Sequence, residues 1–482
     1  MRRTKRAIVK VLAAAAAFSV ASCASTGGPF GISEEQGRAL GEREHPKIVA
    51  AFGGEMNHPE LFAYVDGITK KLMAVSENPA EPVKVTLLDS PVINAMALPG
   101  HVYVTRGLLA LGNSEAELAG VIGHELGHIY KRHTARRISR GNMATLGSVL
   151  VGILTRNPGL MQTAGQAAQL YLLQFSREQE YESDLVGVRL LAAAGYDPAG
   201  AAEFLDSLDR YSKLESQIAG SQAAPPEFLS THPNTAERVR RAAAEAQAVP
   251  RSAAMTAQNS RAQYLSKIDG VLYGDDPVKQ GFIRGSEFIH PEMRISFSAP
   301  GGFKLQNTST AVIATAQNAQ MQFTGANSAD SPAAIIQGPL AQQLGVQFSN
   351  IRQFSVGGRQ GAAGYGRAQT QNGQVVDVQP FVIKWAGDTN YLFLWVSAQD
   401  ATRSLQNGIE QSVASLREIN PASINAPPTQ RIDVVAVRSG DTVASLAQRS
   451  AFENYKRERF CVLNGLDTCA SVAVGEQVKL VR

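Results

Sequence analysis

The sequence predicts a multidomain protein. We expect a mainly α-helical domain with a small β-sheet, then an α+β domain, then a small βααβ module. The chain has 482 residues, which is too long for one typical domain. Its pattern changes from helical to strand-like near residue 286, and a Pro/Asn/Ser-rich linker at 421–431 isolates the last fifty residues. Hydrophobic residues make up 44% and charged residues 18%, which are ordinary globular values.

The N-terminus has the pattern of a secretion signal. Residues 1–22 have a basic start, a short apolar run and small residues before Cys23. The apolar run is too short to span a membrane. This segment holds five of the 46 basic residues and none of the 42 acidic ones, which leaves 41 against 42. The pI near 8.9 therefore comes largely from the signal, and we predict no nucleic-acid binding.

The stretch "VASC", residues 20–23, resembles a bacterial lipobox. The resemblance implies cleavage before Cys23, a lipid on that residue, and a short tether at 23–32. Ala24, rather than Asp, follows the cysteine, which by resemblance favours the periplasmic face of the outer membrane. The alternative is an ordinary signal cleaved nearby, with Cys23 left as a free thiol.

Residues 33–248 are mostly helical in pattern, with an extended patch at 83–105. Three short runs in this patch alternate in polarity and break at Pro and Gly, so we expect strands there. The run "HVYVTRG", 101–107, could offer an edge to which a peptide adds as a strand. Ser114 and Glu117 form a capping-box pattern, so a helix should begin beside them.

That helix contains "VIGHELGHIY", residues 121–130. His124 and His128 lie one turn apart on nearly the same side, so both imidazoles can converge on one metal ion. Glu125 points elsewhere around the helix, where it could act as a general base on water. Gly123 and Gly127 cost helix stability, about 1 kcal/mol each relative to Ala, unless a neighbour packs closely there. This short pattern arises by chance in roughly one chain in a hundred of this size.

A catalytic zinc site needs a third protein ligand. "SREQEYESDLVG", residues 176–187, supplies Glu180 and Asp184, four apart on one predicted helix face. Glu180 can be the ligand, and Asp184 can accept a hydrogen bond from the free ring nitrogen of a ligating histidine. The alternative is a solvated acidic face, because Glu178 and Glu182 lie nearby.

The combined pattern resembles the gluzincin metallopeptidases of the HtpX and CAAX prenyl protease family, in particular their periplasmic BepA and LoiP type. Two further stretches match that family, "NAMALPGHVYVTRGLL" at 94–109 and "STHPNTAERV" at 230–239. The resemblance implies that His124, His128 and Glu180 bind one zinc ion per chain. It also implies the remaining roles: Glu125 is the general base, Asp184 orients a ligand, and His232 and Arg238 occupy the family's His-Pro element. His232 would stabilise the oxyanion or cap the zinc, and the alternative is an ordinary loop histidine.

The sequence also departs from that family. It lacks the spanning helices of integral-membrane members and an obvious helical-repeat domain. The apolar segment 141–174 could cover the cleft or touch lipid, although buried packing helices are the plainer interpretation. The other histidines have no partner pattern, so we interpret them as structural or surface residues: His45, His58, His101, His133 and His290.

The last residues, 432–482, resemble a LysM domain, a family that binds N-acetylglucosamine-containing glycans such as peptidoglycan. The resemblance rests on "VVAVRSGDTVASLAQRS" at 434–450 and "VLNGLDTCASVAVGEQVKLV" at 462–481. The alternative is a small domain that has lost glycan affinity. Cys461 and Cys469 form an even pair in an exported chain, which predicts a disulfide, with two buried thiols as the alternative. Residues 249–285 are expected to be a linker. Residues 286–420 are expected to form an α+β domain of unknown role, with a weak PsbP and Mog1 flavour.

Together these features predict a zinc-dependent metalloendopeptidase that hydrolyses proteins of the cell envelope. The predicted partners are protein substrates, peptidoglycan through 432–482, and the membrane through lipid on Cys23. Two alternatives stay open. One is a chaperone or scaffold with a capped zinc site, and the other is a peptidoglycan peptidase.

Overall fold

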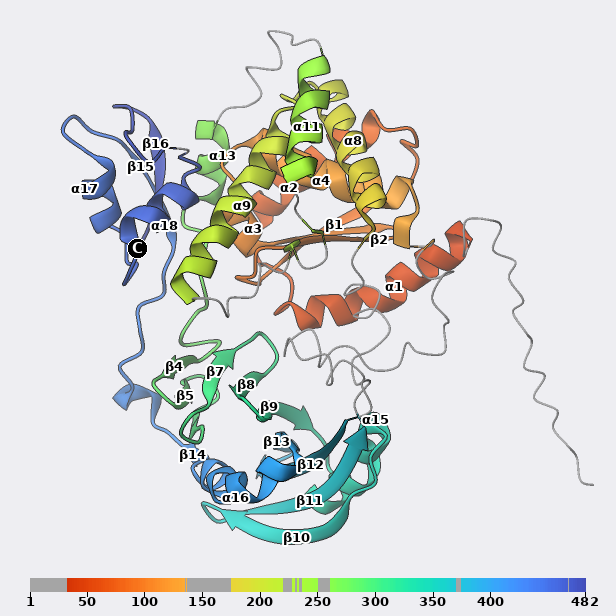
Figure 1. Cartoon of the computed structure of the whole chain (residues 1–482), viewed down its shortest axis with the longest axis vertical. Helices are drawn as coiled ribbons and strands as arrows, with labels where there is room; N and C mark the ends of the chain where they lie inside the picture. The colour runs from red at the N-terminus through yellow and green to blue at the C-terminus, as the bar shows by residue number, and fades with distance from the viewer. Residues whose placement is uncertain are drawn as a thin grey trace, which may run out of the picture.

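The computed structural model describes residues 33–134, 136, 175–219, 228–229, 232–233, 236–249, 261–369, 374–466 and 468–482. The predicted signal, tether and lipid-bearing Cys23 lie outside the described residues, and so does the apolar segment 141–174. Figure 1 shows a helical region that contains a small sheet, a sheet-rich region below it, and a small module at the side of the helical region. No helix within the described ranges is long and apolar enough to cross a membrane.

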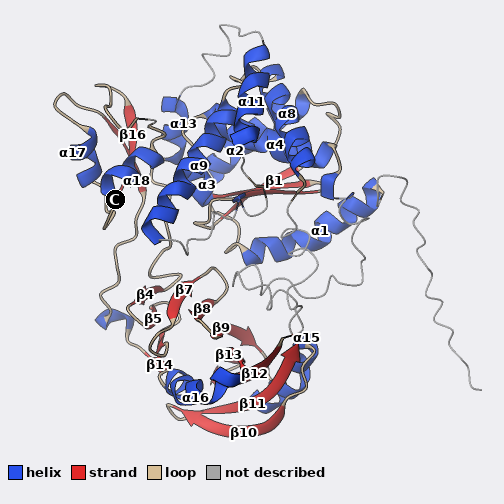
Figure 2. Ribbon diagram, in the orientation of Figure 1, coloured by secondary structure: helices blue, strands red, loops and turns tan. Residues whose placement is uncertain are grey.

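A three-stranded sheet and its surrounding helices form the first domain. The strands lie in the order β1-β3-β2. Their bounds are β1 Lys84–Leu88, β2 Ala95–Leu98 and β3 His101–Thr105. The helices are α1 Glu34–Ala51, α2 Pro59–Ala74, α3 Arg106–Leu111, α4 Glu115–Tyr130, α8 Arg177–Ala193, α9 Gly200–Ala219 and α11 Ala236–Ala248. Figure 2 shows the small sheet lying between α1 and the other helices, as the sequence predicted for a mainly helical domain.

The expected strand edge at "HVYVTRG" is wrong. Strand β3 pairs in parallel with β1 and antiparallel with β2, so it is the central strand of this sheet. Its backbone groups are occupied on both sides and cannot accept a further strand. Among the described residues, the outer edge of β1 is already bonded in part to residues 54–56, so β2 offers the more open edge of this sheet.

The two helices that carry the motifs begin where their capping residues predict. The Ser114 side chain accepts from the backbone N–H of Glu117 at the start of α4. The Glu117 carboxylate accepts instead from the N–H of Asn113, so only half of the predicted capping box forms. Ser176 and Gln179 complete a full box at the start of α8.

Glycines let α4 and α8 approach each other closely. A Cβ on Gly127 would lie 2.9 Å from the Cα of Ser183, and one on Gly123 would lie 3.1 Å from the Cα of Gly187. The first distance is too short for a Cβ and the second is tighter than most Cβ contacts, so the helices meet backbone to backbone. The sequence predicted a closely packed neighbour because glycine lowers helix stability. This contact is that neighbour, and it explains why a glycine precedes each of the two histidines.

The segment expected to be a linker, 249–285, contains helix α13, Arg261–Ile268. Its Tyr264, Leu265 and Ile268 are buried in the same core as α4 and β3. The three apolar residues recur at helical spacing, which the polar surroundings conceal in the sequence. The structure therefore adds this helix to the first domain.

The middle domain is built on an antiparallel sheet of seven strands in the order β10-β11-β12-β13-β9-β8-β7. A second sheet has the order β14-β6-β5-β4, and α16 packs on β12, β13 and β6. The strands are β4 Phe282–Arg284, β5 Glu287–His290, β6 Ile295–Ser298, β7 Lys304–Asn307, β8 Val312–Ala316, β9 Ala319–Asn327, β10 Ser349–Val356, β11 Arg359–Gln369, β12 Val375–Ala386, β13 Thr389–Ala398 and β14 Arg417–Glu418. The helices are α14 Pro332–Ile335, η4 Ile336–Leu340, α15 Ala341–Leu344 and α16 Gln399–Ala414, and η5 Pro421–Ser423 follows in the linker.

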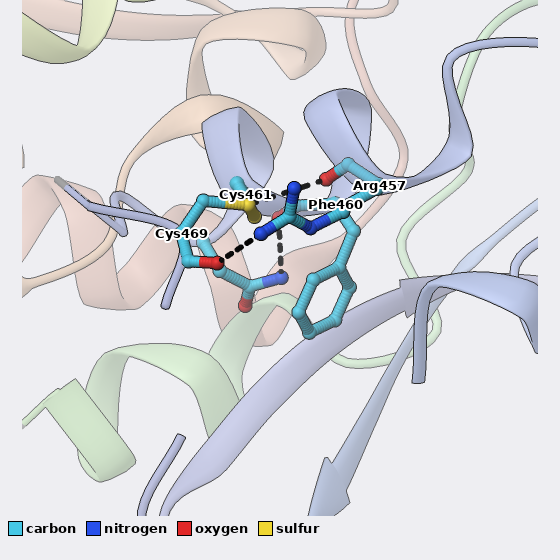
Figure 3. The surroundings of a disulfide bond; sticks show 5 residues. Arg457, Phe460, Cys461 and Cys469 are labelled. Carbon is cyan, nitrogen blue, oxygen red and sulfur yellow. Dashed lines mark hydrogen bonds between the residues drawn. A yellow bond between two sulfur atoms is a disulfide. The ribbon is translucent and has the colours of Figure 1, made fainter. Parts of the chain in front are cut away.

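The terminal module has the βααβ order that the sequence predicted. It consists of β15 Ile432–Ala436, α17 Val443–Gln448, α18 Lys456–Leu463 and β16 Gln477–Val481, with β15 and β16 antiparallel. A disulfide joins Cys461 of α18 to Cys469 in the following loop, which confirms the predicted pair (Figure 3). Arg457 donates to the Cys469 carbonyl at 3.0 Å and so braces the same loop.

Candidate metal centre

Four buried side chains converge on one point between α4 and α8. They are His124 and His128 of α4, Glu180 of α8, and His232, whose ligand atoms all lie within 4.8 Å of one another. His124 Nε2 lies 3.0 Å from His128 Nε2 and 3.3 Å from His232 Nδ1. Glu180 lies 3.6 Å from each of the α4 imidazoles and 3.1 Å from His232 Nδ1. The sequence predicted each of these four residues for the site.

These separations are short enough for the four side chains to hold one zinc ion. Four ligand atoms at the corners of a tetrahedron with bonds of about 2.0–2.1 Å stand about 3.3–3.4 Å apart. The distances of 3.0 to 3.6 Å lie near that value, with Glu180 offering Oε2 to His124 and Oε1 to His128 and His232, and one ligand atom from each residue lies within 4.8 Å of the others. Two imidazoles and a carboxylate are ligands that zinc commonly takes in catalytic sites, and His232 Nδ1 provides a fourth donor.

The hydrogen bonds on the outer ring nitrogens point the lone pairs inward. His124 Nδ1 lies 2.9 Å from Asp184 Oδ1 and donates to it, because a carboxylate can only accept. The His124 lone pair is therefore on Nε2, toward the cluster. Burial alone lowers the pKa of His124, but the hydrogen-bonded Asp184 outweighs it and leaves that pKa raised. The surroundings thus favour positive charge at this point.

His128 is oriented by a residue that the sequence did not single out. Its Nδ1 lies 2.9 Å from Nδ1 of His133, and His133 Nε2 lies 3.0 Å from the Glu182 carboxylate. His133 therefore donates to Glu182 and accepts from His128, which leaves the His128 lone pair on Nε2. Two lone pairs 3.0 Å apart repel unless a cation or a proton lies between them, which is a second argument for a metal.

A turn brings His133 to this position. Helix α4 ends at Tyr130, and Arg132 has a left-handed φ of 54°, so the chain folds back after the helix. The spacing of five between His128 and His133 matches no helical face, which is why helix periodicity gave no indication of it. The sequence predicts a structural or surface role for His133, and His133 is buried. Its partner His128 is a predicted ligand of the metal site.

Arg238 lies behind the ligands. It donates from Nε and Nη2 to both oxygens of Asp184 at 2.8 and 2.7 Å, and its Nη1 lies 2.6 Å from Glu180. Although burial opposes ionisation, Arg238 holds the pKa of Asp184 well below its ordinary value. Nη1 also donates to the Pro233 carbonyl at 3.2 Å. Arg238 therefore joins the α8 carboxylates to the segment that carries His232.

Glu125 is completely buried, and neither of its oxygens has a hydrogen-bond partner among the described residues. His232 Nε2 lies 3.7 Å from Glu125 Oε1. Burial raises the pKa of Glu125, although the neighbouring His232 and His124 counteract part of that effect. A buried carboxylate without partners is costly unless a bound group or water uses it. Its place beside the cluster, and not in it, is the place of a general base.

The two helices contribute two histidines and a glutamate, and a second glutamate lies beside the first histidine. This arrangement defines a zinc metallopeptidase domain of the gluzincin type. Residues 59–246 match the model of Peptidase family M48. The family predicted from the sequence is thus confirmed for this domain, and so is zinc as its metal.

Several curated relatives match the same region. The chain is 28% identical over 222 residues to the beta-barrel assembly-enhancing protease of Escherichia coli, with 44% of each chain covered. It is 39% identical over 157 residues to the mitochondrial metalloendopeptidase OMA1 of Arabidopsis thaliana, with 32% of this chain and 30% of the relative covered. The chain thus spans less than half the length of either relative.

Among solved structures, the cyanobacterial PsbP protein of Synechocystis is similar at 11% identity and a TM-score of 0.24. That similarity covers 29% of this chain and 98% of the other. A similarity at this level supports no argument, and the role of residues 286–420 is not assigned.

Proposed function

We propose that the protein is a zinc-dependent endopeptidase that hydrolyses peptide bonds in proteins of the cell envelope. The observation that carries this proposal is the buried cluster of His124, His128 and Glu180 beside Glu125, which has no hydrogen-bond partner among the described residues. The match of residues 59–246 to the model of Peptidase family M48 supports it.

Each side chain of the site has a separate role in hydrolysis. His124, His128 and Glu180 would hold the zinc, which when bound supplies a Lewis acid for a peptide carbonyl and lowers the pKa of water. Glu125 takes a proton from the attacking water and passes it to the leaving amine. Asp184 fixes the ring of His124 through the 2.9 Å hydrogen bond, and His133 fixes the ring of His128 in the same way.

We propose that His232 caps this site in a resting form of the enzyme. Its Nδ1 occupies the fourth corner, where a catalytic zinc site keeps a place for water or substrate. The ring stacks on Phe228 with centroids 4.8 Å apart and is 1% exposed. We propose that the enzyme rests in this form and that His232 leaves the cluster before a substrate binds. Of the two roles expected for His232, this geometry favours the cap.

The location and partners form a second part of the proposal. The lipobox-like "VASC" supports a lipid anchor on Cys23 at the periplasmic face of the outer membrane, and the βααβ order supports a peptidoglycan-binding LysM module. Similarity to a beta-barrel assembly-enhancing protease supports a role in the quality control of envelope proteins. Sedimentation of the full chain with purified sacculi, with soluble N-acetylglucosamine oligomers as competitor, tests the glycan part.

The test of the proposed activity compares cleavage products in cell envelopes that contain wild type or Glu125→Gln. Envelope proteins cut only in the presence of the wild type would support the endopeptidase. Identical product sets would favour a capped scaffold or chaperone. Release of peptides from purified sacculi, with no cleavage of unfolded protein, would favour a peptidoglycan peptidase.

A further inference from the structure

The terminal module shares its core with the metallopeptidase domain. Ile432, Phe452, Leu463 and Val481 of the module belong to the same buried cluster as residues of α3 and α4. Strand β15 is also bonded to the chain after α13, since Gly270 donates to Ile432 and Ile432 donates to Val271, both at 2.8 Å. The module is therefore joined to the peptidase by packing and backbone hydrogen bonds as well as by the linker.

One module side chain enters the peptidase domain. Lys479 of β16 is 0% exposed, and its Nζ lies 2.8, 3.1 and 2.7 Å from the carbonyl oxygens of Ala110, Leu111 and Gly112. An ammonium group has three donors, which matches these three acceptors. The acceptors are the last carbonyls of α3 and the turn after it, which a helix cannot satisfy from within.

The lysine is held in place from both sides. Asn464 accepts from the backbone N–H of Lys479 at 2.7 Å and donates to its carbonyl at 2.9 Å. Arg261 of α13 donates to the side chain of Asn464 and, at 2.9 Å, to that of Asn113. Burial lowers the pKa of Lys479, and the Glu117 carboxylate of α4 counteracts this effect. A polar network thus spans the module, α13 and the turn.

The same turn starts the metal helix. Only Asn113 and the N-cap Ser114 separate Gly112 from α4, which carries His124, Glu125 and His128. Tyr264 of α13 donates to the Leu109 carbonyl at 2.6 Å, so each carbonyl from 109 to 112 is bonded by a side chain from α13 or β16. Side chains of α13 and β16, which lie outside the helix that carries the metal-binding motif, therefore fix the direction in which α4 begins.

We infer that Lys479 is a positioning residue of the peptidase. It fixes the turn that sets the direction of α4, so the terminal module contributes to the geometry of the metal site. This inference rests on the proposed function for its catalytic consequence. A chain cut before residue 432 would lose these bonds and expose part of the shared core. The module should therefore not behave as a detachable glycan-binding accessory.

The test replaces Lys479 with Met in the full chain, which keeps the apolar stem and removes the donors. The matched control is Lys456→Met, because Lys456 lies in the same module and donates to the Ser450 carbonyl there. We expect Lys479→Met to bind zinc about tenfold more weakly and to lose about tenfold or more in kcat, with little change in KM, because small misplacements of catalytic groups are costly. A role in stability alone would leave both values unchanged in folded protein. Wild-type zinc affinity and kcat in folded Lys479→Met would overturn the inference.

A second measurement needs no variant. Hydrogen exchange in the wild type should give the β16 amides and the amides of residues 112–118 the same free energy of opening, because the two open together. Opening of β16 alone, with the turn still protected, would overturn the inference even if Lys479→Met fails to fold. If the wild type cleaves no protein substrate, the proposed function fails, whereas zinc affinity and hydrogen exchange still decide this inference.

Discussion

Removal of the imidazole that caps the metal site should activate the enzyme. His232 Nδ1 lies 3.3 Å from His124 Nε2 and 3.1 Å from Glu180, so four protein atoms surround the point where zinc would bind. His232→Ala leaves His124, His128 and Glu180, the three-ligand set of a catalytic site. We therefore expect the variant to keep one zinc per chain and to turn over substrate faster than the wild type.

The size of the effect follows from the ligand count. Apparent zinc-binding free energies of about 10–16 kcal/mol over four ligands correspond to about 2.5–4 kcal/mol for each. A cap of that strength would keep about 1% or less of the enzyme open, because each 1.4 kcal/mol is a factor of ten. In the variant, water can take the place of His232 and restore part of the lost zinc-binding free energy. We therefore expect kcat/KM to rise about tenfold to a hundredfold and zinc binding to weaken by a similar factor.

The assay combines zinc titration against a chromophoric chelator with kinetics on an unfolded protein substrate. His290→Ala is the matched control, because His290 is also buried but lies in the middle domain, where it accepts from the N–H of Met293. A fall in kcat with zinc retained would show that His232 supports the transition state and would refute the cap. Unchanged kinetics and unchanged zinc affinity would make His232 an ordinary loop residue.

Three further predictions test separate parts of the structure. Glu125→Gln should retain stoichiometric zinc by metal analysis but cleave about 10²–10⁴-fold more slowly, because the amide cannot accept the proton; wild-type turnover would refute the mechanism. Gly127→Ala places a Cβ 2.9 Å from the Cα of Ser183, so urea unfolding should show a loss of about 1–3 kcal/mol. Its control Gly67→Ala, in open space on α2, should gain up to about 1 kcal/mol, and equal effects would contradict the close helix contact. Cys23→Ser should release the protein from membranes on fractionation, and a variant that stays in the membrane fraction and carries no lipid mass would argue against the lipobox.

The ligands on the two motif helices could be predicted because helical spacing is a local property. His124 and His128 are four residues apart, as are Glu180 and Asp184, and each pair lies on one face of its helix. The glycines in α4 also predicted that another element packs closely against this helix. The disulfide was predicted from an even pair of cysteines in an exported chain, and the βααβ order from the resemblance of the last fifty residues to a LysM domain.

The sequence did not determine the contacts between elements far apart in the chain. It contained no pattern that placed β3 at the centre of its sheet, because the order of strands depends on which pairs form after the chain folds.

The sequence by itself therefore predicted the chemistry of the site: two histidines, a glutamate proposed as a ligand and a glutamate proposed as a base, at helical spacings. Only the tertiary structure decided that a His232 ring nitrogen lies within 4.8 Å of the other ligand atoms, that His133 lies against His128, and that Lys479 donates to the turn before α4. The physical reason is that each of these contacts closes a loop or joins separate domains. Such contacts form because buried polar groups must find partners in the packed chain, and no periodicity in the sequence records which partners those are.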